Sequence, residues 1–274
     1  MKVQEILRNG GFETFTGEVL RIAHDGVLPY AVTDARKLTV EVAAGVRAQC
    51  VLLHSAAVEA AVEVILAEGA MLSVVHVFAA EAFVEMNIMQ AAQSSCNLFV
   101  AELTSANSSY RFALNGDHAE CTLNGLFLAA DAEHCVAAVR VEHNAPDCRS
   151  YSLVKGVAGG TATGEFRGLV YVAPDAQRTD AQQQSRNILL SEQARIRTKP
   201  QLEIYADDVK CTHGATVGQM DTEALLYMRQ RGLSELQARA LQIEGFVSEV
   251  VGHCDHQMLR EALTTAVTDK LHQL

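Results

Sequence analysis

The chain has 274 residues, of which 49% are hydrophobic and 20% are charged, and its formal net charge is -11. This composition is typical of a folded globular protein and excludes a disordered one. The acidic balance argues against a nucleic-acid partner or an anionic membrane, because both require a basic face that neutralises phosphate. The acidity mainly predicts solubility and leaves other partners open.

The sequence lacks signals for export and membrane insertion. No uninterrupted run of about 18 apolar residues is present, which disfavours a membrane span. Residues 1–9 include Lys2, Glu5 and Arg8 with no apolar run behind them, so they do not form a secretory signal. The seven cysteines are scattered and odd in number, which predicts reduced thiols and a cytoplasmic protein.

The first part of the chain predicts many short β-strands. Residues 38–42 alternate between apolar and polar side chains, as a half-buried strand does. Several later apolar runs are nearly continuous Val, Leu and Ala, which indicates strands covered on both faces. These runs occupy residues 50–53, 62–66, 71–78, 98–103, 126–128 and 169–172.

Glycine and asparagine separate the predicted strands. We expect turns with positive φ at residues 115–117, 124–125 and 159–160. The glycines of residues 157–172 would destabilise a helix interior, so that segment is expected to be non-helical. Many short strands with close turns fit a β-solenoid, a sandwich or a barrel. No fixed repeat period is visible, which disfavours a hexapeptide or calcium-binding solenoid, and the pattern leaves solenoid and sandwich equally favoured.

The C-terminal part of the chain predicts three helices. Asp221 stands at an N-cap position and Gly232 at a C′ position, which places a first helix between them. Ser234 and Gln237 have the spacing of a capping box, and an apolar stripe with three- and four-residue spacing follows. A further apolar stripe in residues 259–271 predicts the third helix.

A long and specific pattern of segments begins at Gly164. It comprises Phe166–Val170, Ala176–Ala181, Asn187–Ser191, Thr198–Gly218, Met220–Asp221, Leu226–Leu233 and a helix with Phe246 and Glu249. This pattern resembles the SufB/SufD family of iron–sulfur cluster assembly proteins, and the D branch more than the B branch. The match is weaker over residues 107–163, and before them only the strand pattern is compatible.

The resemblance implies a mainly β protein, with a right-handed parallel β-helix at residues 1–218 and a small C-terminal α-helical subdomain at residues 219–274. It also implies a non-catalytic, SufD-like scaffold subunit of the SUF assembly complex. An ABC-type ATPase of the SufC type would dock on the helices. A SufB-type subunit, or a second copy of this chain, would pair with the β-helix. Family members usually carry a sizeable helical region before the β body, so we expect a short form that lacks most of it.

Cys211 and His213 are the candidate ligands for iron or an iron–sulfur cluster. They stand two apart in an expected strand, so both side chains leave the same face. A thiolate and a neutral imidazole are plausible ligands for iron, but one pair is an incomplete site. The remaining ligands would come from a partner, so the cargo is expected to bind transiently in the complex. The resemblance implies that the pair lies at a subunit junction. The alternative is a buried cysteine and a hydrogen-bonded histidine in an ordinary coil.

The resemblance assigns ATPase docking to the first C-terminal helix, which carries Tyr227, Arg229 and Arg231. Tyrosine and arginine suit an interface because both bury area while keeping a polar end. The alternative is a solvated helix face. Members of the B branch typically have a cysteine shortly before the segment that starts at Thr198. Here Ala194 or a near neighbour takes its place, which favours the supporting role of a D-type subunit.

Other chemically active residues have plainer interpretations. Asp207 and Asp208 are adjacent, so on a strand they would face opposite ways and could not act as a catalytic pair. We expect a turn or an inter-chain contact there. Residues 253–256 (His-Cys-Asp-His) resemble a metal cluster but lie at a helix junction, where capping is expected. The cysteines expected to be plain buried residues are Cys50, Cys96, Cys121, Cys135 and Cys148.

No nucleotide-binding loop, serine-hydrolase elbow or zinc-protease helix is present, so ATP chemistry would belong to another chain. The predicted function is a scaffold in which ATPase-driven movement exposes Cys211 and His213 for cluster assembly. One alternative is a homodimeric β-helix protein that kept the fold but lost cluster chemistry. Another is a carbohydrate-active β-helix enzyme, which would need carboxylates or basic residues grouped on one face. The sequence shows no such grouping.

Overall fold

The computed structural model describes residues 5–7, 11–26 and 28–271. These residues form parallel strands that alternate between two sheets, followed by helices α2 (Thr222–Gln230), α3 (Glu235–Val251) and α4 (Gln257–Leu271). The strands are β1 (Glu13–Thr14), β2 (Val19–Ile22), β3 (Tyr30–Thr33), β4 (Lys37–Val42), β5 (Arg47–His54), β6 (Val58–Leu66), β7 (Met71–Phe78), β8 (Ala82–Gln90), β9 (Ser95–Glu102), β10 (Ala106–Leu114), β11 (Glu120–Ala129), β12 (His134–His143), β13 (Arg149–Ala158), β14 (Thr163–Val172), β15 (Thr179–Leu189), β16 (Arg195–Ile204) and β17 (Val209–Gln219).

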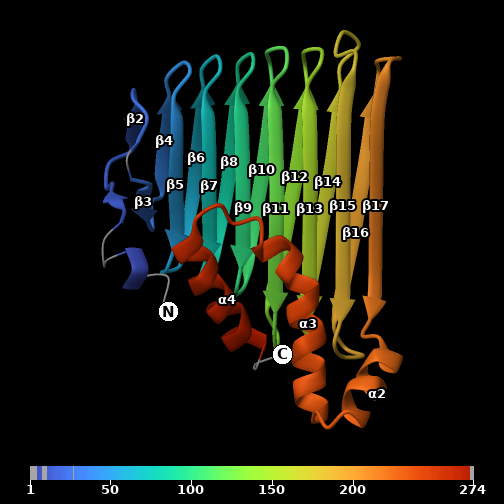
Figure 1. Ribbon diagram of the computed structural model, residues 1–274. Coiled ribbons are helices and arrows are strands. Elements are labelled where there is room, and N and C mark those ends of the chain that lie inside the picture. Colours follow the sequence, from blue (N-terminus) through green and yellow to red (C-terminus); the bar gives the residue numbers. More distant parts are fainter. Residues whose placement is uncertain (1–4, 8–10, 27, 272–274) are drawn as a thin grey trace.

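The odd-numbered strands form a nine-stranded sheet and the even-numbered strands form an eight-stranded sheet, each in chain order. Every strand therefore pairs with the strand two places along, so the chain winds as a flattened β-helix (Figure 1). The predicted parallel β-helix with a small C-terminal helical part is confirmed, and the sandwich that the residue pattern had left open is wrong.

The coils of the β-helix differ in length, which explains why no fixed repeat is visible in the sequence. In an early coil Val58 lies beside Ala82, which is 24 residues further along the chain. In a late coil Thr163 lies beside Arg195, which is 32 residues further. Because the step changes along the chain, residues that stack on one another do not recur at a constant interval.

Two apolar layers bury the strands. Alternate side chains fill the interior of the β-helix, among them Leu52 of β5 and Val74 of β7. On the outer face of the nine-stranded sheet, Val51 and Val75 pack in a second cluster with residues of α3 and α4. Helices α3 and α4 lie across this face (Figure 1). The prediction of strands covered on both faces is therefore confirmed for β5, β7, β9 and β11.

Two buried lysines attach the helices to the β-helix. Lys155 of β13 donates to the backbone oxygen of Phe246 in α3, and its Nζ lies 2.5 Å from the Glu249 carboxylate. Lys270 of α4 contacts both carboxylate oxygens of Glu133, each at 2.7 Å. Buried ammonium groups are stable only when they are paired, so these contacts fix where the helices lie.

The predicted turns are partly confirmed. Gly160 has φ +58° and occupies the turn expected at residues 159–160. The turn after β10 is also present, but its left-handed residue is His118 (φ +57°), while Gly116 allows close approach to Ala92 of the previous coil. The turn predicted at residues 124–125 is wrong, because both residues lie inside β11.

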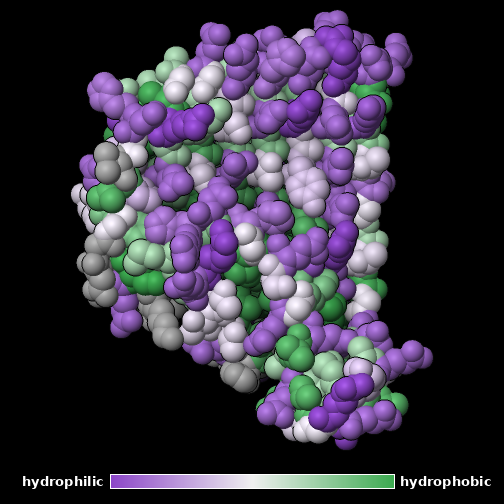
Figure 2. Space-filling model, in the orientation of Figure 1, coloured by the Kyte–Doolittle hydropathy of each residue, from purple (hydrophilic) through white to green (hydrophobic). Residues whose placement is uncertain are grey.

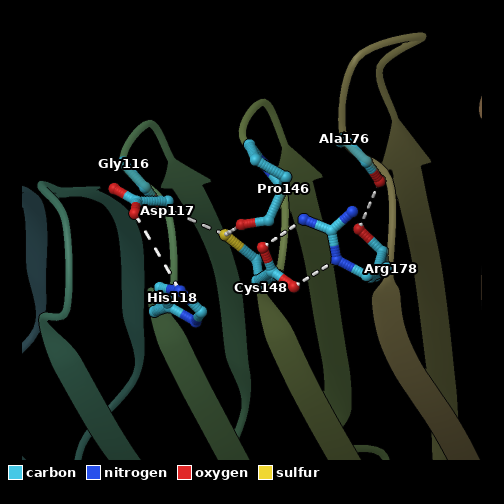
Figure 3. Close-up of polar contacts among 9 residues, drawn as sticks. Gly116, Asp117, His118, Pro146, Cys148, Ala176 and Arg178 are labelled. Atoms are coloured by element: carbon cyan, nitrogen blue, oxygen red, sulfur yellow. Dashed lines mark hydrogen bonds and ion pairs between the residues drawn. The ribbon is translucent and has the colours of Figure 1, made fainter.

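A row of turns joins the eight-stranded sheet to the nine-stranded sheet at one end of the β-helix (Figure 3). Asp147 and Arg178 occupy equivalent left-handed positions, with φ +61° and +58°. The Arg178 guanidinium donates two 2.6 Å hydrogen bonds to the Asp147 carboxylate, and the Cys148 thiol donates to the Gly116 oxygen at 3.2 Å. A left-handed backbone conformation costs about 1–2 kcal/mol for each non-glycine residue. The hydrogen bonds between neighbouring coils help to offset this cost.

The capping residues predicted for the first two C-terminal helices are confirmed. The Asp221 carboxylate accepts hydrogen bonds from the first turn of α2, and Gly232 follows the helix with φ +97°. Ser234 and Gln237 form the predicted capping box of α3. Among the described residues, no helix is both long and apolar enough to cross a membrane.

Candidate functional site

Cys211 and His213 lie in β17, the last strand of the nine-stranded sheet. Their neighbours in β15 are Ala181 and Gln183, which are buried inside the β-helix. Both candidate side chains therefore leave β17 on its interior-facing side, as their spacing predicted. Because β17 is the last strand of its sheet among the described residues, the pair lies at the open end of the β-helix.

The two candidate ligands have different environments. Cys211 is half-buried and packs against Ala181 and Val170, whereas His213 is exposed. Burial raises the pKa of the Cys211 thiol above its ordinary value, and the charge of Asp180 raises it further. The thiol is therefore protonated at neutral pH, although the thiolate is the form that binds metal. A bound metal ion, or a cation from another chain, would have to lower this pKa.

Among the described residues, no group of three or more His, Cys, Asp and Glu side chains could hold a metal ion. Cys211 and His213 are thus two donors of an incomplete set. Beside His213, the buried amide of Gln183 has an Nε2 atom with no hydrogen-bond partner. This amide could orient the imidazole or another ligand at the end of the β-helix.

The open end also presents two strand edges. β17 pairs with β15, β16 pairs with β14, and each is the last strand of its sheet. Pro200 lies within β16, where an edge position tolerates its missing N–H. Apolar side chains are exposed here, including Tyr205 (61%) and Val217 (41%). Long exposed edges with apolar side chains are templates for pairing with another sheet.

The candidate docking residues lie on α2 and at its C-cap. The Arg231 guanidinium stacks 4.6 Å from the centre of the Tyr227 ring, and Arg229 pairs with Glu235 at 3.6 Å. α2 has no buried residue, and its Leu226 is 56% exposed. Figure 2 shows apolar surface on the part of the molecule that projects beyond the β-helix at α2. A short helix gains little stability without packing, so this surface favours a partner.

The plainer interpretations of the remaining residues are confirmed. Residues 207–208 lie in the turn between β16 and β17. In the segment between α3 and α4, the Asp255 carboxylate accepts a hydrogen bond from Ser73, and His256 Nδ1 accepts one from the Leu259 amide at the start of α4. The cysteines that are buried and free, as predicted, are Cys50, Cys96, Cys121, Cys135 and Cys148.

Sequence reasoning missed a polar cluster inside the β-helix. His54 Nε2 lies 2.9 Å from His76 Nε2, and the Tyr110 hydroxyl lies 3.1 Å from His76 Nδ1. The Ser108 hydroxyl donates to an oxygen of the Glu102 carboxyl group at 2.5 Å. Burial raises the pKa of Glu102 to about 8 and lowers that of His54 to about 4. Only a constant coil length in the sequence could have predicted that these residues are neighbours, and the coil length is not constant.

Comparisons with known proteins agree with the geometry. The family model described as SUF system FeS cluster assembly, SufBD core domain, matches residues 30–246. The iron–sulfur cluster assembly protein SufD of Escherichia coli (strain K12) is 37% identical over 158 residues, which are 58% of this chain and 37% of that protein. An iron–sulfur cluster assembly SufBD family protein of Mycobacterium leprae (strain TN) is 34% identical over 178 residues, 62% of this chain and 45% of the relative. The iron–sulfur cluster assembly protein SufD of Bacillus subtilis (strain 168) is 32% identical over 132 residues, which are 48% of this chain and 30% of that protein. The chain thus spans less than half the length of each of these relatives.

Proposed function

The chain belongs to the SufB/SufD family of iron–sulfur cluster assembly proteins and is SufD-like, and from this membership we propose that it is a non-catalytic scaffold subunit of a SUF complex in the cytoplasm. Its cargo would be iron or a nascent iron–sulfur cluster. The observation that carries the proposal is the position of Cys211 and His213, an incomplete donor pair at the open end of a β-helix.

Pairing at this end would complete the site. The edges of β16 and β17 would join the corresponding edges of a SufB-type subunit or of a second copy of this chain. Strand pairing would satisfy the free backbone groups and cover Tyr205 and Val217. The same junction would bring donors from the second chain to Cys211 and His213. Coordination would then hold Cys211 as the thiolate.

The helical subdomain, residues 219–274, would receive the SufC-type ATPase. Tyr227, Arg229 and the C-cap residue Arg231 provide aromatic and cationic contacts on a helix that has no fully buried residue. Since β17 ends at Gln219 and α2 begins at Thr222, displacement of α2 would act directly on the last strand. ATP-driven movement would thereby expose or close the junction that contains Cys211 and His213.

Anaerobic co-purification tests ATPase docking. A tagged full-length chain is co-expressed with the SufC-type and SufB-type proteins of the same organism, and the captured ATPase is quantified. The double variant Leu226→Asp/Tyr227→Asp should lose the ATPase, because it places charge in the exposed apolar surface. The matched control is Phe83→Asp, which changes an exposed apolar residue of β8 and should retain capture.

Full-length chain is used because truncation after residue 218 would expose the apolar outer face of the nine-stranded sheet. Failure of the unmodified chain to capture the ATPase would contradict the docking proposal. It would favour the alternative of a homodimeric protein that kept the fold and lost cluster chemistry. Equal capture by both variants would contradict the assignment to α2.

A further inference from the structure

A hollow of about 170 Å³ lies on the outer face of the eight-stranded sheet, which is the sheet that α3 and α4 do not cover. Four successive strands of the sheet, β10, β12, β14 and β16, contribute to it. Its polar lining consists of Ser109, Arg140, Arg167 and Gln201, and no carboxylate lines it.

The hollow exists because a small residue, Ala138, is surrounded by longer ones. Strand register places Ser109 on one side of Ala138 and Arg167 on the other, each about 4.8 Å away across the sheet. Arg140 follows Ala138 on the same face of β12, about 6.6 Å along the strand. Two guanidinium groups and a hydroxyl therefore surround one small opening on three sides.

The charges around the opening are incompletely balanced. Arg140 donates to Glu142 through Nε at 2.6 Å, and Arg167 Nε lies 3.6 Å from Glu165, so the terminal nitrogens of both arginines can take further acceptors. Lys199 is the register neighbour of Arg167 in β16. Like charges on adjacent strands destabilise a sheet, and an anion between them would offset this repulsion.

The excess of positive charge is confined to the part of the sheet face around the hollow. Strands β6 and β8 of the same sheet carry exposed carboxylates on this face instead, including Glu59, Glu63 and Glu85. A basic cluster that is confined to one end of this face, in a chain of net charge -11, is suited to a specific anion. It does not suit a long polyanion, which would also meet the acidic half of the face.

We propose that this hollow binds the phosphate group of a small phosphate monoester. A tetrahedral oxyanion presents three or more acceptor oxygens, which match donors arriving from Arg140, Arg167 and Ser109. A carboxylate has only two oxygens in one plane and would leave one of these sides unused. Gln201 lies beyond Leu169 in register and contacts the non-phosphate part of the ligand.

The test is isothermal titration of the full-length chain with inorganic phosphate and with AMP, at constant ionic strength maintained with chloride. Both probes should show saturable binding at one site per chain. Arg140→Gln and Arg167→Gln should each weaken binding by about tenfold or more, because each removes a charge-assisted hydrogen-bond donor.

Two further variants separate a built site from general attraction to basic surface. Ala138→Leu fills the hollow without changing the charge and should abolish binding. Circular dichroism checks that this variant still folds, which is expected because Ala138 is half-exposed. Arg21→Gln removes an exposed arginine at the other end of the same sheet face and should leave binding unchanged.

Absence of saturable binding with both probes would overturn the proposal. Binding of Ala138→Leu with the affinity of the unmodified chain would overturn it too, because the hollow would then have no role. Binding of inorganic phosphate with exclusion of AMP would contradict the assignment to a monoester. None of these outcomes bears on ATPase capture, so this site and the proposed scaffold function can fail separately.

Discussion

Lys155 of β13 lies beneath α3 and donates a 2.6 Å hydrogen bond to the backbone oxygen of Phe246, with its ammonium group 4.4 Å from the centre of the Phe246 ring. The Lys155 side chain is only 4% exposed, and it also pairs with Glu249. One residue of the β-helix thus satisfies a helix carbonyl, a carboxylate and an aromatic face. This contact makes α3 part of the same packed structure as the nine-stranded sheet.

Lys155→Met should destabilise the chain by about 1–3 kcal/mol, because it keeps most of the side-chain volume but removes the ammonium group from the Phe246 oxygen and leaves Glu249 with only its 3.5 Å contact to Arg186. Urea unfolding followed by circular dichroism measures the change. Lys37→Met, at an exposed position of β4, is the control and should change stability little. Equal stability of the two variants would show that Lys155 does not anchor α3.

Gly156→Ala should destabilise the β-helix, whereas Gly214→Ala should be nearly neutral. A Cβ atom at Gly156 would lie 2.0 Å from the Phe127 ring, which is fully buried, and overpacking of this kind costs about 1–3 kcal/mol. A Cβ atom at Gly214 would meet nothing within 4 Å. Thermal unfolding of the two variants compares the same substitution in one sheet. A similar melting temperature for both would contradict the close packing of Phe127 on Gly156.

Glu102 predicts a dependence of stability on pH. Its folded-state pKa is raised to about 8 by burial, so between the unfolded value near 4.5 and about 8 the folded state holds a proton that the unfolded state has released. The contribution of Glu102 to stability must therefore fall as pH rises through this window. Between pH 5.5 and 7.5 this contribution should decrease by about 2–3 kcal/mol. His54, His76 and His143 act in the opposite direction below about pH 6.5, because burial lowers their folded-state pKa values and the unfolded state then binds more protons. The Glu102 contribution must therefore be measured as a difference from a variant that keeps these histidines.

Urea unfolding at these two pH values checks the prediction against Glu102→Gln, which cannot ionise. The histidines are common to both proteins, so the free energy of unfolding of the unmodified chain relative to that of the variant should decrease by about 2–3 kcal/mol from pH 5.5 to 7.5. The window ends below the pH at which unfolded cysteines begin to ionise, so the buried thiols do not add to the slope. An identical slope in both proteins would contradict a protonated Glu102 inside the β-helix.

Local features of the fold could be predicted from sequence, because they depend on residues close together in the chain. Asp221 and the capping box of Ser234 and Gln237 define helix starts by contacts within one turn, and both predictions hold. The Asn-Gly pair at residues 124–125 shows the limit of such signals. It is typical of a turn, yet Gly125 lies within β11, where a Cβ atom would approach Val154 of the next coil.

Register between coils could not be predicted, because the step between stacked residues ranges from 17 residues, as for Glu13 and Tyr30, to 32, as for Thr163 and Arg195. The common face of Cys211 and His213 followed from the two-residue period of a strand. Their position at an open end did not, because it depends on β17 being last in its sheet. The grouping of Arg140 and Arg167 around Ala138 has the same origin and was therefore missed.

We propose that Cys211 and His213 hold the cargo at the open end of the β-helix. This proposal is tested most directly by purifying the co-expressed complex anaerobically and measuring its iron and acid-labile sulfide per complex. The variants are Cys211→Ser and His213→Ala, with Thr212→Ala as the control, since Thr212 lies between them and leaves β17 on the opposite face. We expect loss of iron and sulfide in the first two variants and full retention in the third, with the complex intact in all. Unchanged iron and sulfide in both Cys211→Ser and His213→Ala would contradict it.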